Sequence, residues 1–301
     1  MLQRWIRSLF AVLCVAVLSG PVQADEVSIE VEGLTVLGNL ELASGKSLKS
    51  DGAILLVHDT LAHDRMEILS ALQELLRERG YNTLSITLSL GLNERRGLFN
   101  CALEQDHRNE DAAVEIGRWI EWLKSQGASS VTLAGHGRGG NQVAIYAAKS
   151  PDKVVKRLVL IAPIADRPAT LSQQFSLRFR QPLEPILAQA QKDVDEGNAT
   201  ALLVNVPFLS CENAKVTAAA FVNYYGANQN LYTPSLLPHI NMPILVAVGD
   251  LDPLSSEIIP AVEGIPGADQ IKLEVIPGAD NYFRDLAAED LTAKISDFLS
   301  K

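Results

Sequence analysis

The sequence lacks a long apolar segment, and this absence argues against a membrane-spanning helix. The apolar run at residues 9–18 has about ten residues, whereas a helix needs about 20 to cross a bilayer. Arg4 and Arg7 precede the run, and the small-residue end Val22-Gln23-Ala24 follows it. This layout predicts a secretory signal peptide over residues 1–24. We therefore expect an exported protein, periplasmic or secreted, with no stable membrane anchor after cleavage.

Basic residues are scarce as well. The chain has 26 Lys and Arg against 36 Asp and Glu, which gives a formal net charge of −10. Two of the basic residues lie in the predicted signal peptide, so 24 remain against 36 acidic ones and the mature charge is −12. So acidic a chain is a poor partner for nucleic acid or an anionic membrane surface.

Cysteine is the third scarce residue, with three in 301 positions. Cys14 lies in the predicted signal peptide without the small residues that usually precede a lipid-modified cysteine, so we do not expect a lipoprotein. The mature chain keeps Cys101 and Cys211. Because exported proteins tend to pair an even number of cysteines, we expect a disulfide between them. The alternative is two unpaired thiols, one of them buried as a small hydrophobe.

The chain does contain a regular alternation of strand and helix patterns. The continuous apolar run at residues 53–57, for example, is typical of a strand buried on both faces. Strands are expected at residues 27–31, 34–41, 53–57, 83–88, 130–134, 155–162, 243–248 and 271–276. Helices are expected at residues 66–79, 111–125, 140–148, 184–194, 218–225 and 291–299. The alternation predicts an α/β fold with a doubly wound, mostly parallel sheet.

The strand pattern is interrupted at residues 163–238, where helix signals dominate. We expect a mainly helical cap inserted there into one domain that spans residues 25–301; a plain set of connecting helices is the alternative. A mature length of 277 residues suits one α/β domain with an insertion.

A strand, a sharp turn and a helix start follow one another at residues 131–140, Val-Thr-Leu-Ala-Gly-His-Gly-Arg-Gly-Gly. This segment resembles the nucleophile elbow of the α/β-hydrolases, in which small residues flank a tightly turned serine in Gly-x-Ser-x-Gly. Gly137 stands where the family has that serine. The chain therefore has no side-chain oxygen at this point to attack a carbonyl group.

Two later segments resemble the rest of the family's catalytic triad. Asp252, in the acidic turn after the strand at 243–248, matches the acid that orients the catalytic histidine. The alternative is that Asp250 and Asp252 only bind backbone amides of the turn. Asn281 takes the place of the histidine itself, and an amide cannot accept and return a proton near neutral pH.

The loop after residues 53–57 reads Val57-His58-Asp59-Thr60, where the family usually has His-Gly and donates an amide to the oxyanion hole. Asp59 would bring a carboxylate close to the place where an oxyanion must be stabilised, which opposes acyl transfer. The resemblance covers residues 27–301. It implies an α/β-hydrolase fold with a degenerate triad, acting as a binding or scaffold protein rather than an enzyme. The N-myc downstream-regulated family, also with glycine at the elbow, is a precedent.

The ligand of such a protein would be a small molecule or another protein. Because ligands of doubly wound sheets collect at the carboxyl ends of the strands, we expect the pocket around His136, Arg138, Asp252 and Asn281. Arg138 has three possible roles: an ion pair with an acid such as Asp59, binding of an anionic ligand, or exposure at the helix start. His63, His107 and His239 are expected to have no special role.

Three other functions stay open. Gly135, Gly137 and Gly140 satisfy the dinucleotide pattern Gly-x-Gly-x-x-Gly, but the next strand ends without an acid to hold a ribose, and no cofactor is expected. A metal site would draw on His58, Asp59, His136 and Asp252; hydrogen bonds that support the loops are the favoured role of these histidines, and no metal is expected. An active hydrolase would need Ser255, Ser256 or Thr60 as its nucleophile, each without an obvious base.

Overall fold

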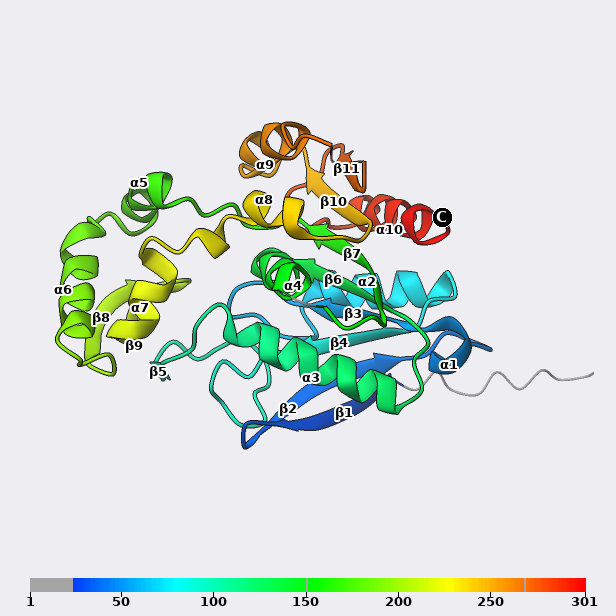
Figure 1. The fold of residues 1–301 in the computed structure, drawn as a ribbon, viewed down its shortest axis with the longest axis horizontal. Coiled ribbons are helices and arrows are strands. Elements are labelled where there is room, and N and C mark those ends of the chain that lie inside the picture. The colour runs from blue at the N-terminus through cyan, green and yellow to red at the C-terminus, as the bar shows by residue number, and fades with distance from the viewer. Residues whose placement is uncertain (1–23, 150, 268) are drawn as a thin grey trace, which may run out of the picture.

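The computed structural model describes residues 24–149, 151–267 and 269–301 (Figure 1). The predicted signal peptide lies outside the described residues except for Ala24, where the first strand begins. Within the described ranges, no helix is long and apolar enough to cross a membrane.

The centre of the molecule is an eight-stranded sheet with the order β1-β2-β4-β3-β6-β7-β10-β11. β1 and β4 pair antiparallel with β2, and the pairs from β4 to β11 are parallel. The strands are β1 Ala24–Val31, β2 Leu34–Glu41, β3 Ala53–Val57, β4 Thr83–Thr87, β6 Val131–His136, β7 Val155–Ile161, β10 Ile244–Gly249 and β11 Ile271–Ile276. The predicted doubly wound, mostly parallel sheet is confirmed.

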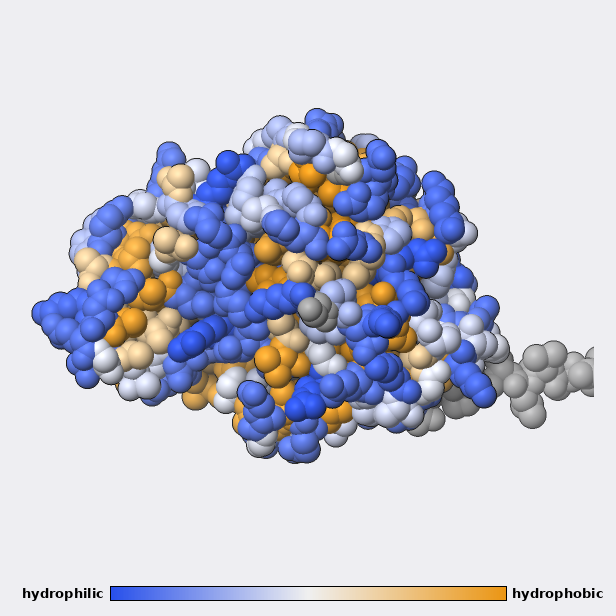
Figure 2. Space-filling view, viewed as in Figure 1, coloured by the Kyte–Doolittle hydropathy of each residue, from blue (hydrophilic) through white to orange (hydrophobic). Residues whose placement is uncertain are grey.

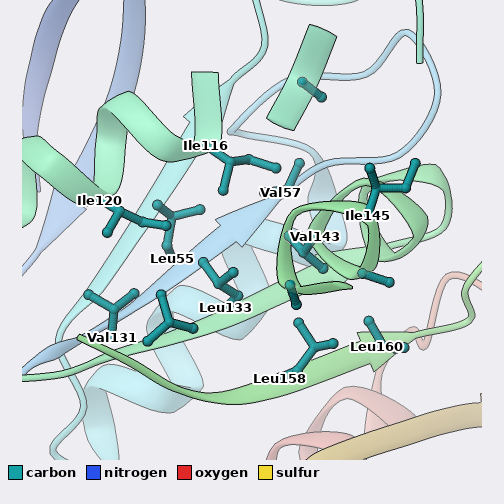
Figure 3. Packing of buried hydrophobic residues seen from close by; sticks show 14 of the residues in the cluster. Leu55, Val57, Ile116, Ile120, Val131, Leu133, Val143, Ile145, Leu158 and Leu160 are labelled. Carbon is teal, nitrogen blue, oxygen red and sulfur yellow. The ribbon is translucent and has the colours of Figure 1, made fainter. Parts of the chain in front are cut away.

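Helices cover both faces of this sheet because the central strands are apolar on both sides. In β3, Leu55 and Val57 pack with α3 and α4 on one face (Figure 3). Ile54 and Leu56 belong to the other face, together with α2 and α10. This alternation is the period of two expected for a strand. The helices outside the insertion are α1 Leu48–Asp51, α2 Glu67–Glu78, α3 Asp111–Ser125, α4 Arg138–Lys149, α9 Ser255–Glu263 and α10 Leu286–Leu299.

Residues 163–238, between β7 and β10, are called the insert below. Its part from α5 to α7 lies at one end of the molecule, at the left of Figure 1, whereas α8 lies beside α4 of the sheet domain. The apolar cluster of the insert includes Phe208, Phe221 and Tyr224, and Leu61 and Phe99 of the sheet domain pack into it. The elements of the insert are α5 Pro168–Phe179, α6 Glu184–Asp195, β8 Leu202–Phe208, β9 Cys211–Thr217, α7 Ala218–Tyr225, η1 Gln229–Leu231 and α8 Thr233–Leu236, and the short η2 Leu237–His239 crosses its C-terminal boundary. The face seen in Figure 2 is mostly hydrophilic, with an apolar area around α7 of the insert.

The insert contains a β-hairpin that the helix-rich pattern did not predict. β8 pairs antiparallel with β9, and β9 pairs in parallel with the short β5, Glu104–Gln105, from the loop after β4. Pro207 and two register shifts interrupt β8. A strand with proline and bulges at a sheet edge has no clean alternation of apolar residues, so its pattern is hard to recognise.

The predicted disulfide between Cys101 and Cys211 is confirmed. It joins the loop after β4 to the first residue of β9, with the two Cα atoms 5.5 Å apart. The bond therefore fastens the insert to the sheet domain at a point far from the two places where the chain enters and leaves the insert.

Candidate functional site

The turn between β6 and α4 brings the chain to the carboxyl edge of the sheet. Gly137, between the two elements, has a φ of +56°, a left-handed conformation that L side chains adopt only with strain. A Cβ atom at Gly139 would overlap the backbone carbonyls of Val57 and His58. The glycines thus let α4 start directly against the end of β3, and α4 begins at Arg138, two residues earlier than predicted.

The carboxylate of Asp59 fills the space beside Gly137. A Cβ atom at position 137 would lie 2.8 Å from Oδ2 of Asp59 and would overlap its Oδ1 and Cγ. Oδ1 accepts hydrogen bonds from the backbone N–H of Arg138 at 2.7 Å and from the Thr60 hydroxyl at 3.1 Å. A carboxylate oxygen therefore occupies the place where a side chain on the turn would begin and takes the first N–H of α4.

Asp59 is held in its ionised form. Burial alone would raise the pKa of this carboxyl, but nearby His136 and the hydrogen bonds from Arg138 and Thr60 lower it below its usual value. A negative charge therefore lies at the centre of the site at neutral pH.

The side chain of Arg138 is largely buried and pairs with Asp166, not with Asp59. Nη2 donates to Oδ2 of Asp166 at 3.0 Å, and Nε donates to the Thr60 hydroxyl at 3.1 Å. The guanidinium also lies over the ring of Tyr224, 5.2 Å from its centre. The exposed position considered for Arg138 is wrong, since only 11% of its side chain is accessible.

Asp252 and Asn281 come from the loops after β10 and β11. Oδ1 of Asp252 accepts from the backbone N–H of Leu254 at 3.0 Å, and its buried Oδ2 has no hydrogen-bond partner among the described residues. Burial raises the pKa of Asp252. The backbone carbonyl of Asn281 accepts from Nε2 of His136 at 2.6 Å. No imidazole among the described residues is hydrogen-bonded to the carboxyl group of Asp252.

His58 supports the loop that carries Asp59. Its Nδ1–H donates to the Asp59 carbonyl at 2.7 Å, and its Nε2 accepts from the Leu88 N–H and from Nη2 of Arg95, both at 3.0 Å. Burial and the charge of Arg95 lower the pKa of His58 to about 3, so the ring is neutral. Both ring nitrogens are used, which leaves none for a metal ion. Across residues 24–149, 151–267 and 269–301, no group of three or more His, Cys, Asp or Glu side chains is arranged to hold a metal.

The three hydroxyl groups considered as alternative nucleophiles also donate hydrogen bonds to other groups. The hydroxyl of Ser255 donates to the Asp252 carbonyl at 2.7 Å, and that of Ser256 donates to the Pro253 carbonyl at 3.0 Å. Thr60 donates to Asp59. Among the described residues, none of these hydroxyls has a hydrogen bond to an imidazole, which is one common means of activating such a nucleophile.

The dinucleotide alternative meets a direct obstacle in Asp59. A pyrophosphate in such a motif lies on the N-terminus of the helix after the glycines. Here the N–H of Arg138 at that terminus is bound to a carboxylate. The site therefore presents negative charge to the group it would have to bind.

A cavity of about 360 Å³ opens between this edge of the sheet and the insert. Its polar lining comes from Asp59, Thr60, Arg138, Asp166, Gln174, Arg178, Ser210 and Asn281. Its aromatic lining comes from Phe175, Phe179, Tyr224, Tyr225 and Tyr282. We call this the main pocket. Of the residues expected around it, Arg138 and Asn281 line it, whereas His136 and Asp252 are buried and do not.

Sequence reasoning missed Arg95 and Asp166, which hold His58 and Arg138. Arg95 lies in the long loop after β4, and Asp166 lies in the first turn of the insert. Neither position belongs to a motif or a periodic pattern. Only the fold brings them next to the turn.

The family described as "Protein of unknown function (DUF1749)" matches residues 66–231, more than half of the chain. The chain belongs to the DUF1749 family. Among characterised proteins, this DUF1749 chain is 25% identical over 252 residues to "Epoxide hydrolase 3" of Xenopus tropicalis. That match covers 74% of this chain and 65% of the relative, so the chain spans somewhat less than two thirds of the relative's length.

Solved esterases share the fold of this DUF1749 chain. Est1E from Butyrivibrio proteoclasticus superposes with a TM-score of 0.63 at 17% identity, over 92% of this chain and 99% of Est1E. The Pyrococcus furiosus esterase Pf2001 gives 0.60 at 14% identity, over 93% and 91%. Dienelactone hydrolase from Anabaena variabilis gives 0.56 at 19% identity, over 93% and 97%. The DUF1749 chain therefore has the α/β-hydrolase fold.

Proposed function

We propose that this protein is an exported α/β-hydrolase-fold protein that binds a small molecule in the main pocket and does not catalyse acyl transfer. The observation that carries the proposal is the position of Asp59. Its carboxylate fills the space beside Gly137 and accepts the N–H of Arg138.

This arrangement opposes each step of acyl transfer. In α/β-hydrolases the N–H of the residue after the nucleophile helps to stabilise the oxyanion. Here that N–H already binds a carboxylate, which would repel the negative charge that develops on a substrate carbonyl. Gly137 supplies no nucleophile and Asn281 no general base, so attack and proton transfer both lack their group.

Export is supported by the signal-peptide pattern and by the Cys101–Cys211 disulfide. Disulfides persist mainly in oxidising compartments such as the periplasm or the extracellular space. The acidic composition leaves a small molecule or a protein as the kind of partner, rather than nucleic acid.

A second candidate is a hydrolase in which Asp59 itself is the nucleophile. One observation favours it: a carboxylate stands where the family has its serine and lines the main pocket. A relative named an epoxide hydrolase fits such chemistry, since a carboxylate can attack an electrophilic carbon to form an ester. Against it, both hydrogen bonds to Oδ1 weaken the nucleophile, and the nearby His136 uses its Nε2–H for the Asn281 carbonyl.

Turnover measurements separate the two candidates. Purified mature protein would be assayed with p-nitrophenyl acetate, p-nitrophenyl butyrate and styrene oxide, beside Asp59→Asn and Asp252→Ala variants. We expect no turnover above the rate with the variants, and no mass added to the peptide that contains Asp59. Turnover that the Asp59→Asn variant loses would reject the proposal and make Asp59 the nucleophile.

A further inference from the structure

The polar groups of the main pocket differ in how fully they are used by the protein itself. Two nitrogens of Arg138 already donate within the protein, since Nε binds Thr60 and Nη2 binds Asp166. Its third nitrogen, Nη1, has no hydrogen-bond partner among the described residues, but it is closed off from solvent. A molecule in the pocket therefore has no direct access to the unpaired N–H groups of Nη1.

Two carboxylate oxygens at the pocket, in contrast, are unused. Asp59 employs only Oδ1 and Asp166 only Oδ2 in hydrogen bonds with described residues. Oδ2 of Asp59 and Oδ1 of Asp166 are not among the atoms sealed off from solvent. Both residues line the pocket, so these oxygens are available as acceptors.

The charge balance at this end of the pocket is negative. Arg138 supplies one positive charge against the two carboxylates of Asp59 and Asp166. Arg178 also lines the pocket, but its side chain is exposed, lies over Phe179 and borders a separate open hollow with Arg180 and Gln181. Its charge is at the solvent end, where screening by water and salt is strongest.

The aromatic residues of the lining provide a surface on which the apolar part of a ligand can pack. Phe175 packs against Phe179 and Tyr225, with ring centres 4.8 and 5.1 Å apart. Aromatic rings attract cations through the negative charge on their faces. Three pocket rings already have a guanidinium beside them: Tyr224 has Arg138, Phe179 has Arg178 and Tyr282 has Arg284. The rings of Phe175 and Tyr225 therefore remain available for contact with a ligand.

We propose that the main pocket binds an organic cation, an amine whose N–H groups donate to Oδ2 of Asp59 and Oδ1 of Asp166 and whose apolar body packs on Phe175 and Tyr225. Free carboxylate acceptors favour a ligand that donates hydrogen bonds, and the local excess of negative charge favours a cationic one. A cavity of about 360 Å³ suits a molecule of this small size. This inference rests on the proposed ligand-binding function and adds the chemical class of the ligand.

The test uses three molecules of nearly equal shape and different charge: benzylamine, benzyl alcohol and benzoate. Binding to the mature protein at pH 7.5 would be measured by calorimetry and by protein NMR shifts. We expect benzylamine to bind at least tenfold more tightly than either of the others, and the difference to shrink as salt is raised. Asp59→Asn and Asp166→Asn each should weaken benzylamine at least tenfold and leave benzyl alcohol unchanged.

The two asparagine variants keep an oxygen that can accept from Arg138, so the pocket should retain its shape; circular dichroism and the melting temperature verify that they fold. Asp290→Asn, on the exposed side of α10, removes the same charge from a residue that does not line the pocket and should change nothing. Benzoate or benzyl alcohol binding as tightly as benzylamine would overturn the cation class while leaving a binding pocket. Absence of binding by all three, or an amine affinity untouched by both variants, would also overturn it. Ester turnover, in contrast, would overturn the non-catalytic function.

Discussion

Gly137 and Asp59 form one structural unit at the residue scale. The turn requires a left-handed φ at position 137, and the carboxylate of Asp59 occupies the volume that a side chain there would need. A glycine at position 137 and an aspartate in the neighbouring loop are therefore sterically compatible with each other. A serine at position 137 should therefore lower the free energy of unfolding as long as Asp59 is present.

Gly137→Ser should lower the free energy of unfolding by about 2–4 kcal/mol, because the new Cβ overlaps Asp59 and the conformation strains an L residue. Urea unfolding measures this loss. In an Asp59→Gly background the same substitution should lower it by only about 1–2 kcal/mol, the share due to backbone strain. Equal losses in both backgrounds would show that the carboxylate does not occupy that space.

The buried histidines predict a loss of stability in mild acid. Burial lowers the pKa of His58 and of His107 to about 3, whereas the unfolded chain has histidines with a pKa near 6.5. The unfolded state therefore binds more protons between these values, and stability present above pH 6.5 declines as the pH falls. Each histidine should contribute about 2 kcal/mol of this decline from pH 7 to pH 5.

His107→Asn isolates the contribution of His107. Carboxylates that titrate in a similar pH range are present in both the wild type and the variant, so their effect cancels in the comparison. Urea unfolding at pH 7, 6 and 5 should show a pH dependence weaker by about 2 kcal/mol in the variant. Identical pH dependence would mean that His107 titrates normally in the folded protein.

At the residue scale, the sequence predicted which catalytic groups of the α/β-hydrolases are missing. It did not predict which side chains fill the space around these positions. Gly137, Asp252 and Asn281 could be recognised because each follows an apolar strand in a familiar spacing. The carboxylate of Asp59 was expected near the oxyanion position, yet its contact with Gly137 depends on how closely two loops approach. The partners Arg95 and Asp166 depend on contacts between distant segments, which no local pattern encodes.

At the scale of elements, patterns with strong periodicity were predicted and irregular ones were not. The buried strands β3 and β10, the edge strand β11 and the helix α7 lie within a residue of their expected bounds. α9 escaped prediction because Pro260 lies inside it, and proline normally ends a helix. α10 begins at Leu286, five residues before the expected start.

The disulfide is the element-scale feature with the largest expected effect on stability. It closes a segment of 110 residues, and a cross-link over so long a loop restricts the unfolded chain strongly. Reduction, or the Cys101→Ser, Cys211→Ser double variant, should lower the free energy of unfolding by roughly 2–5 kcal/mol. Thermal melts with and without reductant measure the effect. The melting temperature of the double variant should not change when reductant is added. A wild-type melting temperature that reductant leaves unchanged would contradict this stabilising role.

At the scale of the whole molecule, the chain has the α/β-hydrolase fold, with a pocket between the sheet domain and the insert. The turn after β6 and the loops after β3, β10 and β11 still meet at one edge, and a pocket lies between that edge and the insert. The sheet could be predicted because strands and helices alternate along the chain. The hairpin and the pocket lining could not, because they arise where the insert folds against the domain.

The central claim is that Asp59, Gly137 and Asn281 together prevent ester hydrolysis at this site. The most direct test compares hydrolysis of p-nitrophenyl acetate by the Gly137→Ser, Asn281→His double variant and by the triple variant that adds Asp59→Gly. We predict that wild type and double variant are inactive, and that the triple variant releases a burst of p-nitrophenol as its new serine is acylated. A wild-type protein that turns over ester, or a double variant as active as the triple, would contradict the account.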